Sequence, residues 1–219
     1  MKVCVIGANG QIGQHLVRKL NTSNSHEVIA MVRKKEQIEK LNQQNIHARL
    51  IDLEASVETI ADAIEGVDAV VFTAGSGGST GADKTILVDL DGAIKSVEAA
   101  KLVGVPRFVL VSAIGIQNYH KEKHLDWIDR SSYYSAAKYY ADKWLENTDL
   151  DYTIIRPGGL INIPETGKVK IAKELKYEKI PREDVANVII RSLDNKNTYK
   201  KSFDVTSGDS SIDEALNSI

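Results

Sequence analysis

The chain has 219 residues, of which 42% are hydrophobic and 26% are charged. This balance is typical of a soluble globular protein and argues against disorder. Because 28 basic and 30 acidic side chains leave a formal net charge of −2, we expect no nucleic-acid or membrane partner. No apolar run approaches the roughly 20 residues that span a bilayer, and no secretory leader is apparent. A single cysteine, Cys4, excludes an intrachain disulfide, so we expect a cytoplasmic protein.

Seven short apolar runs are typical of buried β-strands, because strands covered on both faces carry nearly continuous apolar sequence. They are Val3–Ile6, Val28–Val32, Ala48–Ile51, Ala69–Phe72, Phe108–Val111, Tyr152–Ile155 and Phe203–Val205. Longer amphipathic stretches alternate with these runs and predict helices over Gln11–Leu20, Lys35–Leu41, Val57–Ile64, Asp83–Leu102, Ser132–Glu146 and Arg182–Leu193.

The alternation of strands and helices predicts an α/β fold with a doubly wound parallel sheet. No repeat or Pro/Gly-rich linker divides the chain, so we expect a single domain over residues 1–219. Residues 113–131 and 159–181 show the least regular pattern, and irregular segments of that length are usually lids or substrate walls. Because ligands of open α/β sheets bind beyond the carboxyl ends of the strands, functional residues are expected directly after each strand.

A glycine-rich loop, Gly7-Ala8-Asn9-Gly10-Gln11-Ile12-Gly13, joins the first predicted strand to the first predicted helix. Glycine permits a positive φ and a close backbone approach where a strand turns under a pyrophosphate, and the helix N-terminus favours the bound anion. The pattern therefore predicts a dinucleotide site whose pyrophosphate is held by Gly7, Asn9, Gly10, Gln11 and Ile12. The alternative is a tight strand-to-helix turn without a ligand.

The G-x-x-G-x-x-G spacing resembles the extended and atypical members of the short-chain dehydrogenase/reductase superfamily. Further matches are Asp52-Leu53, Thr73-Ala74-Gly75, the segment 151–158 and Arg182-Glu183-Asp184-Val185-Ala186. The likeness is greatest to small NAD(P)-dependent epimerase-like and NmrA-like proteins and covers nearly the whole chain. It implies a Rossmann-type NAD(P)-binding fold in which Leu53 contacts the cofactor and Ala74, Gly75 and Pro157 contact its nicotinamide half. Asp52 would accept a hydrogen bond from the adenine amino group, or it only caps the following helix.

The end of the second strand indicates which dinucleotide is bound. NAD-selective proteins usually carry Asp or Glu there to hold the ribose 2′-hydroxyl, whereas this chain has Arg33, followed by Lys34 and Lys35. A guanidinium suits a 2′-phosphate through bidentate, charge-assisted bonds. We therefore predict that NADP(H) is preferred over NAD(H). The alternative is a solvated basic helix start.

Reduction of a carbonyl needs a proton donor, and in the resembling superfamily a Tyr-x-x-x-Lys pair supplies it. Residues at i and i+4 share one helix face, so the ammonium should lie near the phenol and lower its pKa. The pattern occurs three times, as Tyr119/Lys123, Tyr134/Lys138 and Tyr139/Lys143. Position favours Tyr134/Lys138, because this pair opens the helix between the fifth and sixth strands. In that family the lysine also binds the cofactor ribose, and Ser112 matches the serine that polarises the substrate carbonyl.

Asp89 stands where the superfamily usually carries an active-site Asn. Ile86, Asp89 and Ala93 fall on one face of the predicted helix, so we expect the carboxylate to be partly buried beside the core. Asp89 would then relay a proton or anchor a water, or it makes a structural hydrogen bond to a backbone group. His120 and His124 share the i, i+4 spacing of zinc ligands, but no third ligand is evident, and we expect no metal site.

These features lead to two hypotheses. The first is an NADPH-dependent oxidoreductase that reduces a small carbonyl, quinone or flavin, with Ser112, Tyr134, Lys138 and Asp89 at the reacting end. Its substrate would lie between residues 113–131 and 159–181. The second is a non-catalytic NADP(H)-binding redox sensor that regulates a partner protein. The sequence leaves open the substrate, the direction of hydride transfer and whether the protein is a homodimer.

Overall fold

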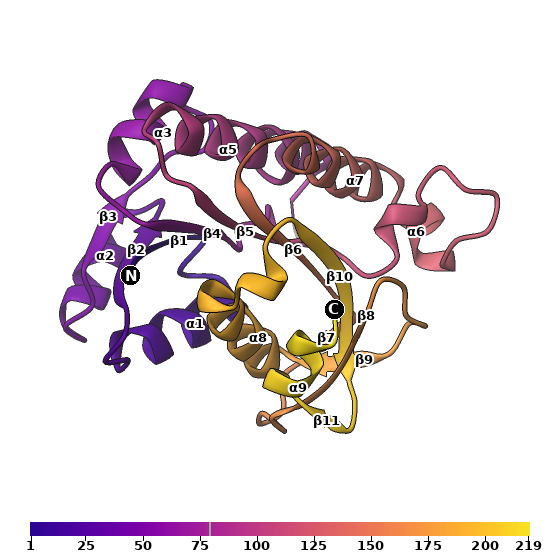
Figure 1. Ribbon diagram of the computed structural model, residues 1–219. Helices are drawn as coiled ribbons and strands as arrows, with labels where there is room; N and C mark the ends of the chain where they lie inside the picture. The colour runs from indigo at the N-terminus through magenta and orange to yellow at the C-terminus, as the bar shows by residue number, and fades with distance from the viewer. Residues whose placement is uncertain (79) are drawn as a thin grey trace.

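One mixed sheet forms the centre of the computed structural model, which describes residues 1–78 and 80–219 (Figure 1). Its strands are β1 (Lys2–Ile6), β2 (Glu27–Val32), β3 (Ala48–Leu50), β4 (Ala69–Phe72), β5 (Arg107–Val111), β6 (Asp151–Pro157), β8 (Lys168–Ala172), β10 (Lys201–Ser207) and β11 (Ser210–Ser211). Their spatial order is β11-β8-β10-β6-β5-β4-β1-β2-β3. In this order all strands from β3 to β10 run parallel, and β8 pairs antiparallel with β10. The run β3-β2-β1-β4-β5-β6 is the Rossmann order.

Helices cover both faces of the sheet, as Figure 1 shows. One face carries α3 (Val57–Ile64), α5 (Gly92–Leu102) and α7 (Ser132–Glu146), and the other carries α1 (Gln11–Asn21), α8 (Arg182–Asp194) and α9 (Ile212–Asn217). Helix α2 (Lys35–Asn42) lies beside β3 at one edge. Two apolar clusters fill the layers, one including Leu16 and Ile189, the other Ile60 and Leu145. The predicted doubly wound α/β fold is confirmed.

The helix predicted over Asp83–Leu102 is interrupted. A short helix, α4 (Ala82–Lys84), leads into a π-helical stretch, η1 (Thr85–Asp91), and only then into α5. In a π-helix the hydrogen bonds join residues five apart, so side chains no longer follow the spacing of a regular helix. The expectation that Ile86 and Asp89 share one helix face is therefore wrong, because Ile86 is 41% exposed, but the expected burial of the Asp89 carboxylate is found, since Asp89 is 2% exposed.

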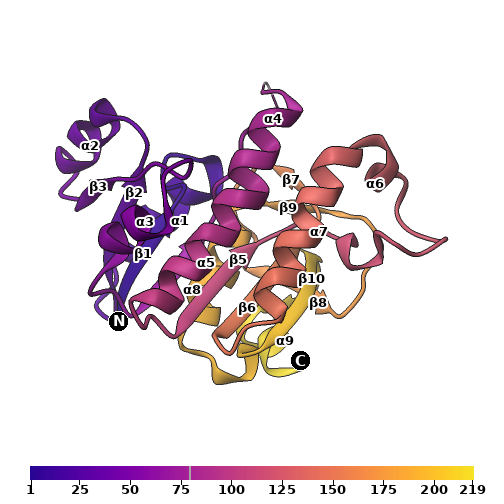
Figure 2. The same cartoon turned by 90° about the horizontal axis from the view of Figure 1, so that it is seen from above.

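The two irregular segments contain more structure than their sequences indicate. The first contains a 3₁₀ turn, η2 (Ile116–Asn118), and α6 (Asp126–Arg130). The second contains β8, which pairs antiparallel with β10, and a separate two-stranded sheet of β7 (Gly159–Ile161) and β9 (Lys179–Pro181). A further 3₁₀ turn, η3 (Lys196–Thr198), precedes β10. Figure 2 shows α4, α6, β7 and β9 at the same end of the molecule, where the parallel strands end.

Candidate functional site

A cavity of about 820 Å³ lies beyond the carboxyl ends of the central strands. Its wall comes from the loops after β1, β2, β3, β4 and β5, from the start of α7, and from β7 and α8. Cavities of this size hold small-molecule ligands and cofactors. All predicted site residues but Pro157 line it: Gly7, Asn9, Gly10, Gln11, Ile12, Arg33, Asp52, Leu53, Ala74, Gly75, Asp89, Ser112, Tyr134 and Lys138.

Pro157 is buried at the end of β6 and does not belong to the cavity wall. Its carbonyl oxygen accepts a hydrogen bond from the backbone nitrogen of Ile114 at 3.0 Å. The residue therefore ties the segment after β5 to the end of β6, while the nicotinamide contact expected from the resemblance stays a prediction.

The glycine loop has the backbone geometry that a pyrophosphate requires. Gly7 has φ +89°, and a Cβ there would lie 2.5 Å from the backbone nitrogen of Ala74. Helix α1 begins at Gln11 with Gly10 as its N-cap, without a side-chain cap and without an acidic residue in its first turn. The first amides of α1 are thus left available to an anion, as at other helix N-termini that bind phosphate. These residues fit the pyrophosphate of a dinucleotide.

Two predicted adenine-side residues lie in the same cavity. Arg33 is exposed directly after β2, where an NAD-selective protein would carry an acid. Asp52 follows β3, and its Oδ1 accepts a hydrogen bond from the backbone nitrogen of Glu54 at 2.9 Å. The alternative role of Asp52 as the cap of the following helix is wrong, because Ser56 caps α3 by accepting from the backbone nitrogen of Thr59.

Lys138 and Asp89 form a buried ion pair at the other end of the cavity. Lys138 Nζ lies 3.5 Å from Asp89 Oδ1 and donates to the carbonyl oxygen of Val111 at 3.3 Å. The second carboxylate oxygen of Asp89 accepts from the backbone nitrogen of Ser76 at 2.9 Å. The carboxylate therefore makes the expected structural hydrogen bond and also meets the lysine. The π-helical stretch brings it there, and such stretches often occur at functional sites.

Tyr134 lies one helical turn before Lys138, whose ammonium is 5.8 Å from the centre of the phenol ring. Burial raises the pKa of Tyr134, the positive charge of Lys138 lowers it, and the nearby carboxylates of Asp89 and Asp142 raise it. The net shift is upward. The expectation that the lysine leaves this pKa below its usual value is therefore wrong for the free protein, because burial outweighs the lysine.

Ser112 is buried immediately after β5, and its Oγ makes no well-formed hydrogen bond among the described residues, although the hydroxyl lies close enough to Asp142 to lower the pKa of that carboxyl. A buried hydroxyl without a well-formed hydrogen bond is costly, so this Oγ is suited to donate to a group in the cavity. The competing Tyr/Lys pairs lie elsewhere. Tyr139 is outside the cavity wall, and Lys143 pairs with Glu146 at 2.7 Å. Tyr119 is also outside the wall and packs its ring against that of Tyr139.

Sequence reasoning missed a second buried ion pair beneath the reacting end. Arg156, on β6, donates from Nε to Asp142 Oδ2 at 2.8 Å and from Nη2 to Glu146 Oε1 at 3.1 Å. Arg156 and Asp142 each have side chains that are only 2% exposed. Asp142 follows Lys138 by one helical turn, and its Oδ1 has no partner among the described residues. The spacing Lys138-x-x-x-Asp142 is the signal that places both side chains on one face of α7.

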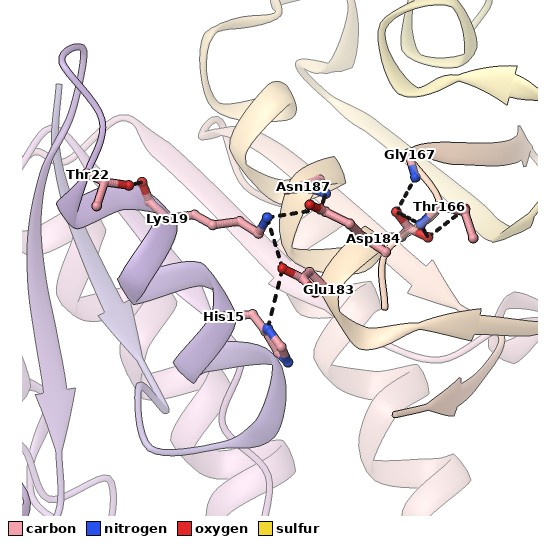
Figure 3. Close-up of polar contacts among 9 residues, drawn as sticks. His15, Lys19, Thr22, Thr166, Gly167, Glu183, Asp184 and Asn187 are labelled. Carbon is pink, nitrogen blue, oxygen red and sulfur yellow. Dashed lines mark hydrogen bonds and ion pairs between the residues drawn. The ribbon is translucent and has the colours of Figure 1, made fainter. Parts of the chain in front are cut away.

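The start of α8 holds the segment after β7 in place (Figure 3). Asp184 is fully buried, and its carboxylate accepts hydrogen bonds from the backbone nitrogens of Thr166 and Gly167. On α1, Lys19 pairs with Glu165 at 2.9 Å and with Glu183 at 3.1 Å. These contacts join the helix of the glycine loop to the segment that brings Leu160 and Arg182 to the cavity.

Two other findings concern the described residues, 1–78 and 80–219. Their helices include none that is long and apolar enough to cross a membrane. They contain no group of three or more His, Cys, Asp and Glu side chains placed to hold a metal ion. His124 instead faces Asp129 at 3.5 Å, and His120 contacts the hydroxyl of Tyr140.

Comparison with known proteins shows the family of this chain. The family model described as NAD(P)H-binding matches residues 7–196. The uncharacterized sugar epimerase YhfK of Bacillus subtilis is 54% identical over 216 residues, 99% of each chain. A Bacillus halodurans structure, named as an NAD-dependent epimerase/dehydratase, is 39% identical with a TM-score of 0.90 and covers 100% of both chains.

The oxidoreductase YlbE of Lactococcus lactis is 33% identical, with a TM-score of 0.89 over 100% of this chain and 96% of its own. The cavity, the glycine loop and these similarities agree on one class of protein. The chain belongs to the NAD(P)H-binding family of Rossmann-fold proteins, among relatives named as epimerases and oxidoreductases.

Proposed function

We propose that the protein is an NADPH-dependent oxidoreductase that reduces a small carbonyl, quinone or flavin. One observation carries the proposal: Tyr134, Lys138, Ser112 and Asp89 meet in the same cavity as the glycine loop. A dinucleotide site alone would not need a buried Lys–Asp pair beside a phenol and a serine hydroxyl without a well-formed hydrogen bond. Charged side chains are almost never fully buried unless they are paired, and perturbed groups in a cleft are candidates for catalysis.

Each side chain has a chemical role in this proposal. Bound NADPH would supply the hydride. Ser112 Oγ donates a hydrogen bond to the substrate oxygen, and the Tyr134 hydroxyl donates the proton that the oxygen gains. Burial lowers the pKa of Lys138, but attraction from the phenolate form of Tyr134 and from the carboxylates of Asp89 and Asp142 outweighs it, and the net shift is upward. Lys138 therefore stays an ammonium that stabilises negative charge as it develops on the substrate and the phenol.

The proposed preference for NADPH rests on Arg33, the exposed cation of the cavity wall after β2. A charge-assisted bond to the 2′-phosphate should contribute about 1.5–3 kcal/mol, so NADPH should bind at least about tenfold more tightly than NADH. We expect Arg33→Ala to remove most of that difference without changing NADH affinity. Fluorescence titration measures both constants, and equal affinities in the unchanged protein would refute the preference.

The role of Tyr134 as the proton donor is tested in two steps. Aldehydes, quinones and flavins are first screened as substrates, and a carbonyl substrate from this screen is then used. We expect Tyr134→Phe to lower turnover of the carbonyl by roughly 10²–10⁴-fold while NADPH affinity stays nearly unchanged. Tyr139→Phe is the matched control, because it alters the neighbouring Tyr/Lys pair outside the cavity wall and should have little effect. A carbonyl is required, because flavins and quinones accept hydride without a closely placed acid. Full turnover by Tyr134→Phe would refute the role of Tyr134.

The names of two relatives favour a second candidate, a sugar epimerase. An epimerase would transfer hydride to a retained cofactor and back to the same substrate, with no net oxidation. The same assay separates the candidates: net consumption of NADPH supports the reductase, and interconversion of sugar epimers without consumption supports the epimerase. Firm NADPH binding without either activity would favour the redox sensor, and capture of a partner with and without NADPH would then test it.

A further inference from the structure

Of the seven charged side chains on the cavity wall, three are paired with an opposite charge among the described residues, and Asp52 and three arginines are not. Asp89 faces Lys138, and Glu54 pairs with Lys84, which lies outside the wall. Three arginines on the wall, Arg33, Arg130 and Arg182, have no carboxylate within 4.0 Å among the described residues. The wall therefore has an excess of guanidinium groups with no acidic partner.

These three arginines belong to two ends of the cavity. Arg33 follows β2, on one side of β1, and is assigned above to the cofactor 2′-phosphate. Arg130 is the last residue of α6 and precedes Tyr134 by four residues. Tyr134 itself lies in the first turn of α7. Arg182 begins α8 directly after β9, the partner of β7. Figure 2 shows α6, β7 and β9 at the end of the molecule where the parallel strands finish.

Arg182 is only partly satisfied by the protein. Its Nη1 donates to the side-chain oxygen of Asn162 at 2.8 Å, which is a neutral acceptor. A guanidinium has five N–H donors, and it stays charged in proteins. Burial lowers the pKa of Arg182, with no opposing carboxylate to raise it. Arg130 makes neither a side-chain hydrogen bond nor an ion pair with any part of the chain that the structure describes. Both fork-shaped groups retain donors for a ligand.

We propose that the substrate carries an anionic group, a carboxylate or a phosphate monoester, which Arg130 and Arg182 bind while its reducible group faces Tyr134. This inference rests on the proposed reductase function and narrows its substrate class. The cofactor pyrophosphate has its own donors in the amides at the start of α1. Arginine binds planar carboxylates and phosphates through two parallel hydrogen bonds, so the two side chains would select for charge and orient the substrate.

Selection for a carboxylate is tested by comparing the reduction of 4-formylbenzoate with that of its uncharged methyl ester. Selection for a phosphate is tested by comparing the reduction of FMN with that of riboflavin. In each pair the reacting group is the same and only the anion differs. We expect Arg182→Gln and Arg130→Gln each to lower kcat/KM for the preferred anionic substrate by about tenfold to a hundredfold. The neutral partner should change by less than about twofold, and NADPH affinity should not change. Arg191→Gln is the control, because Arg191 is an exposed arginine on α8 outside the cavity wall.

Three results would overturn the inference. Equal losses for the charged and neutral substrates would mean that the arginines support the fold rather than an anion. Weaker NADPH binding in Arg182→Gln would assign that guanidinium to the cofactor. Equal kcat/KM within both pairs in the unchanged protein would show no selection for charge. A higher kcat/KM for 4-formylbenzoate than for its methyl ester indicates a carboxylate, and a higher kcat/KM for FMN than for riboflavin indicates a phosphate.

Equilibrium binding separates this inference from the proposed reductase function. If none of the four compounds is reduced, the reductase proposal fails for these substrates, but calorimetry of the NADP⁺ complex still measures charge selection. We expect FMN or 4-formylbenzoate to bind more tightly than its neutral partner, and both arginine variants to abolish the difference. Equal binding within both pairs would overturn the inference whatever the turnover assay shows.

Discussion

The ion pair beneath the reacting end should support both the fold and the site. We consider Arg156→Met, which keeps much of the side-chain volume and removes the charge. Arg156 is 2% exposed, and its loss leaves the Asp142 carboxylate, also 2% exposed, without its cation. Breaking a buried pair by removing one partner costs about 3–5 kcal/mol. For a chain of this length that corresponds to a fall in Tm of roughly 6–20 °C.

The stability lost in Arg156→Met should depend on pH in a defined direction. Burial raises the pKa of Asp142 above its usual value, although Arg156 opposes the shift. A raised carboxyl pKa means that the folded protein holds the proton more tightly than the unfolded chain, so stability falls as pH rises through the raised pKa. Removing Arg156 raises the Asp142 pKa further. The free energy of unfolding that Arg156→Met loses relative to the unchanged protein should therefore be smaller at about pH 5 than at about pH 7.5.

Urea unfolding of both proteins at the two pH values measures these free energies. The double variant Arg156→Met/Asp142→Leu is the decisive control, because apolar residues often replace a buried pair without loss. We expect it to recover most of the stability, since the remaining Glu146 is 20% exposed and pairs with Lys143 at 2.7 Å. A single variant within about 1 kcal/mol of the unchanged protein, or a double variant no more stable than the single one, would refute the reasoning.

Two further predictions concern the glycine loop and the cysteine. Gly7→Ala should greatly weaken NADPH binding, because its φ is +89° and the added Cβ would lie 2.5 Å from the Ala74 nitrogen. Gly66→Ala, with φ +76° and open space around it, should cost only about 1–2 kcal/mol and leave titrated NADPH affinity unchanged. Burial raises the pKa of the Cys4 thiol to about 12, so a thiol reagent at about pH 8 should label it only in urea. Rapid labelling of the native protein would contradict that burial.

The sequence alone determined the framework, and most of the site residues that it predicted line the candidate cavity, because both depend on local signals. The apolar runs predicted the parallel strands, and the glycine loop predicted the dinucleotide site between β1 and α1. Since the carboxyl ends of parallel strands meet at one edge, residues that follow different strands, such as Arg33 and Ser112, line one cavity. Position along the chain also separated Tyr134/Lys138 from the two other pairs of the same spacing.

Tertiary structure alone decided what depends on contacts between distant segments. The pairing of Arg156 with Asp142 requires β6 to pack under α7, and the spacing that places Asp142 on the Lys138 face of α7 does not predict Arg156 as its partner. The π-helical stretch that buries Asp89 beside Lys138 departs from the regular period on which sequence patterns rely. The pKa of Tyr134 is raised because burial, with the carboxylates of Asp89 and Asp142, outweighs a nearby cation, and that balance depends on how distant segments of the folded chain surround the phenol.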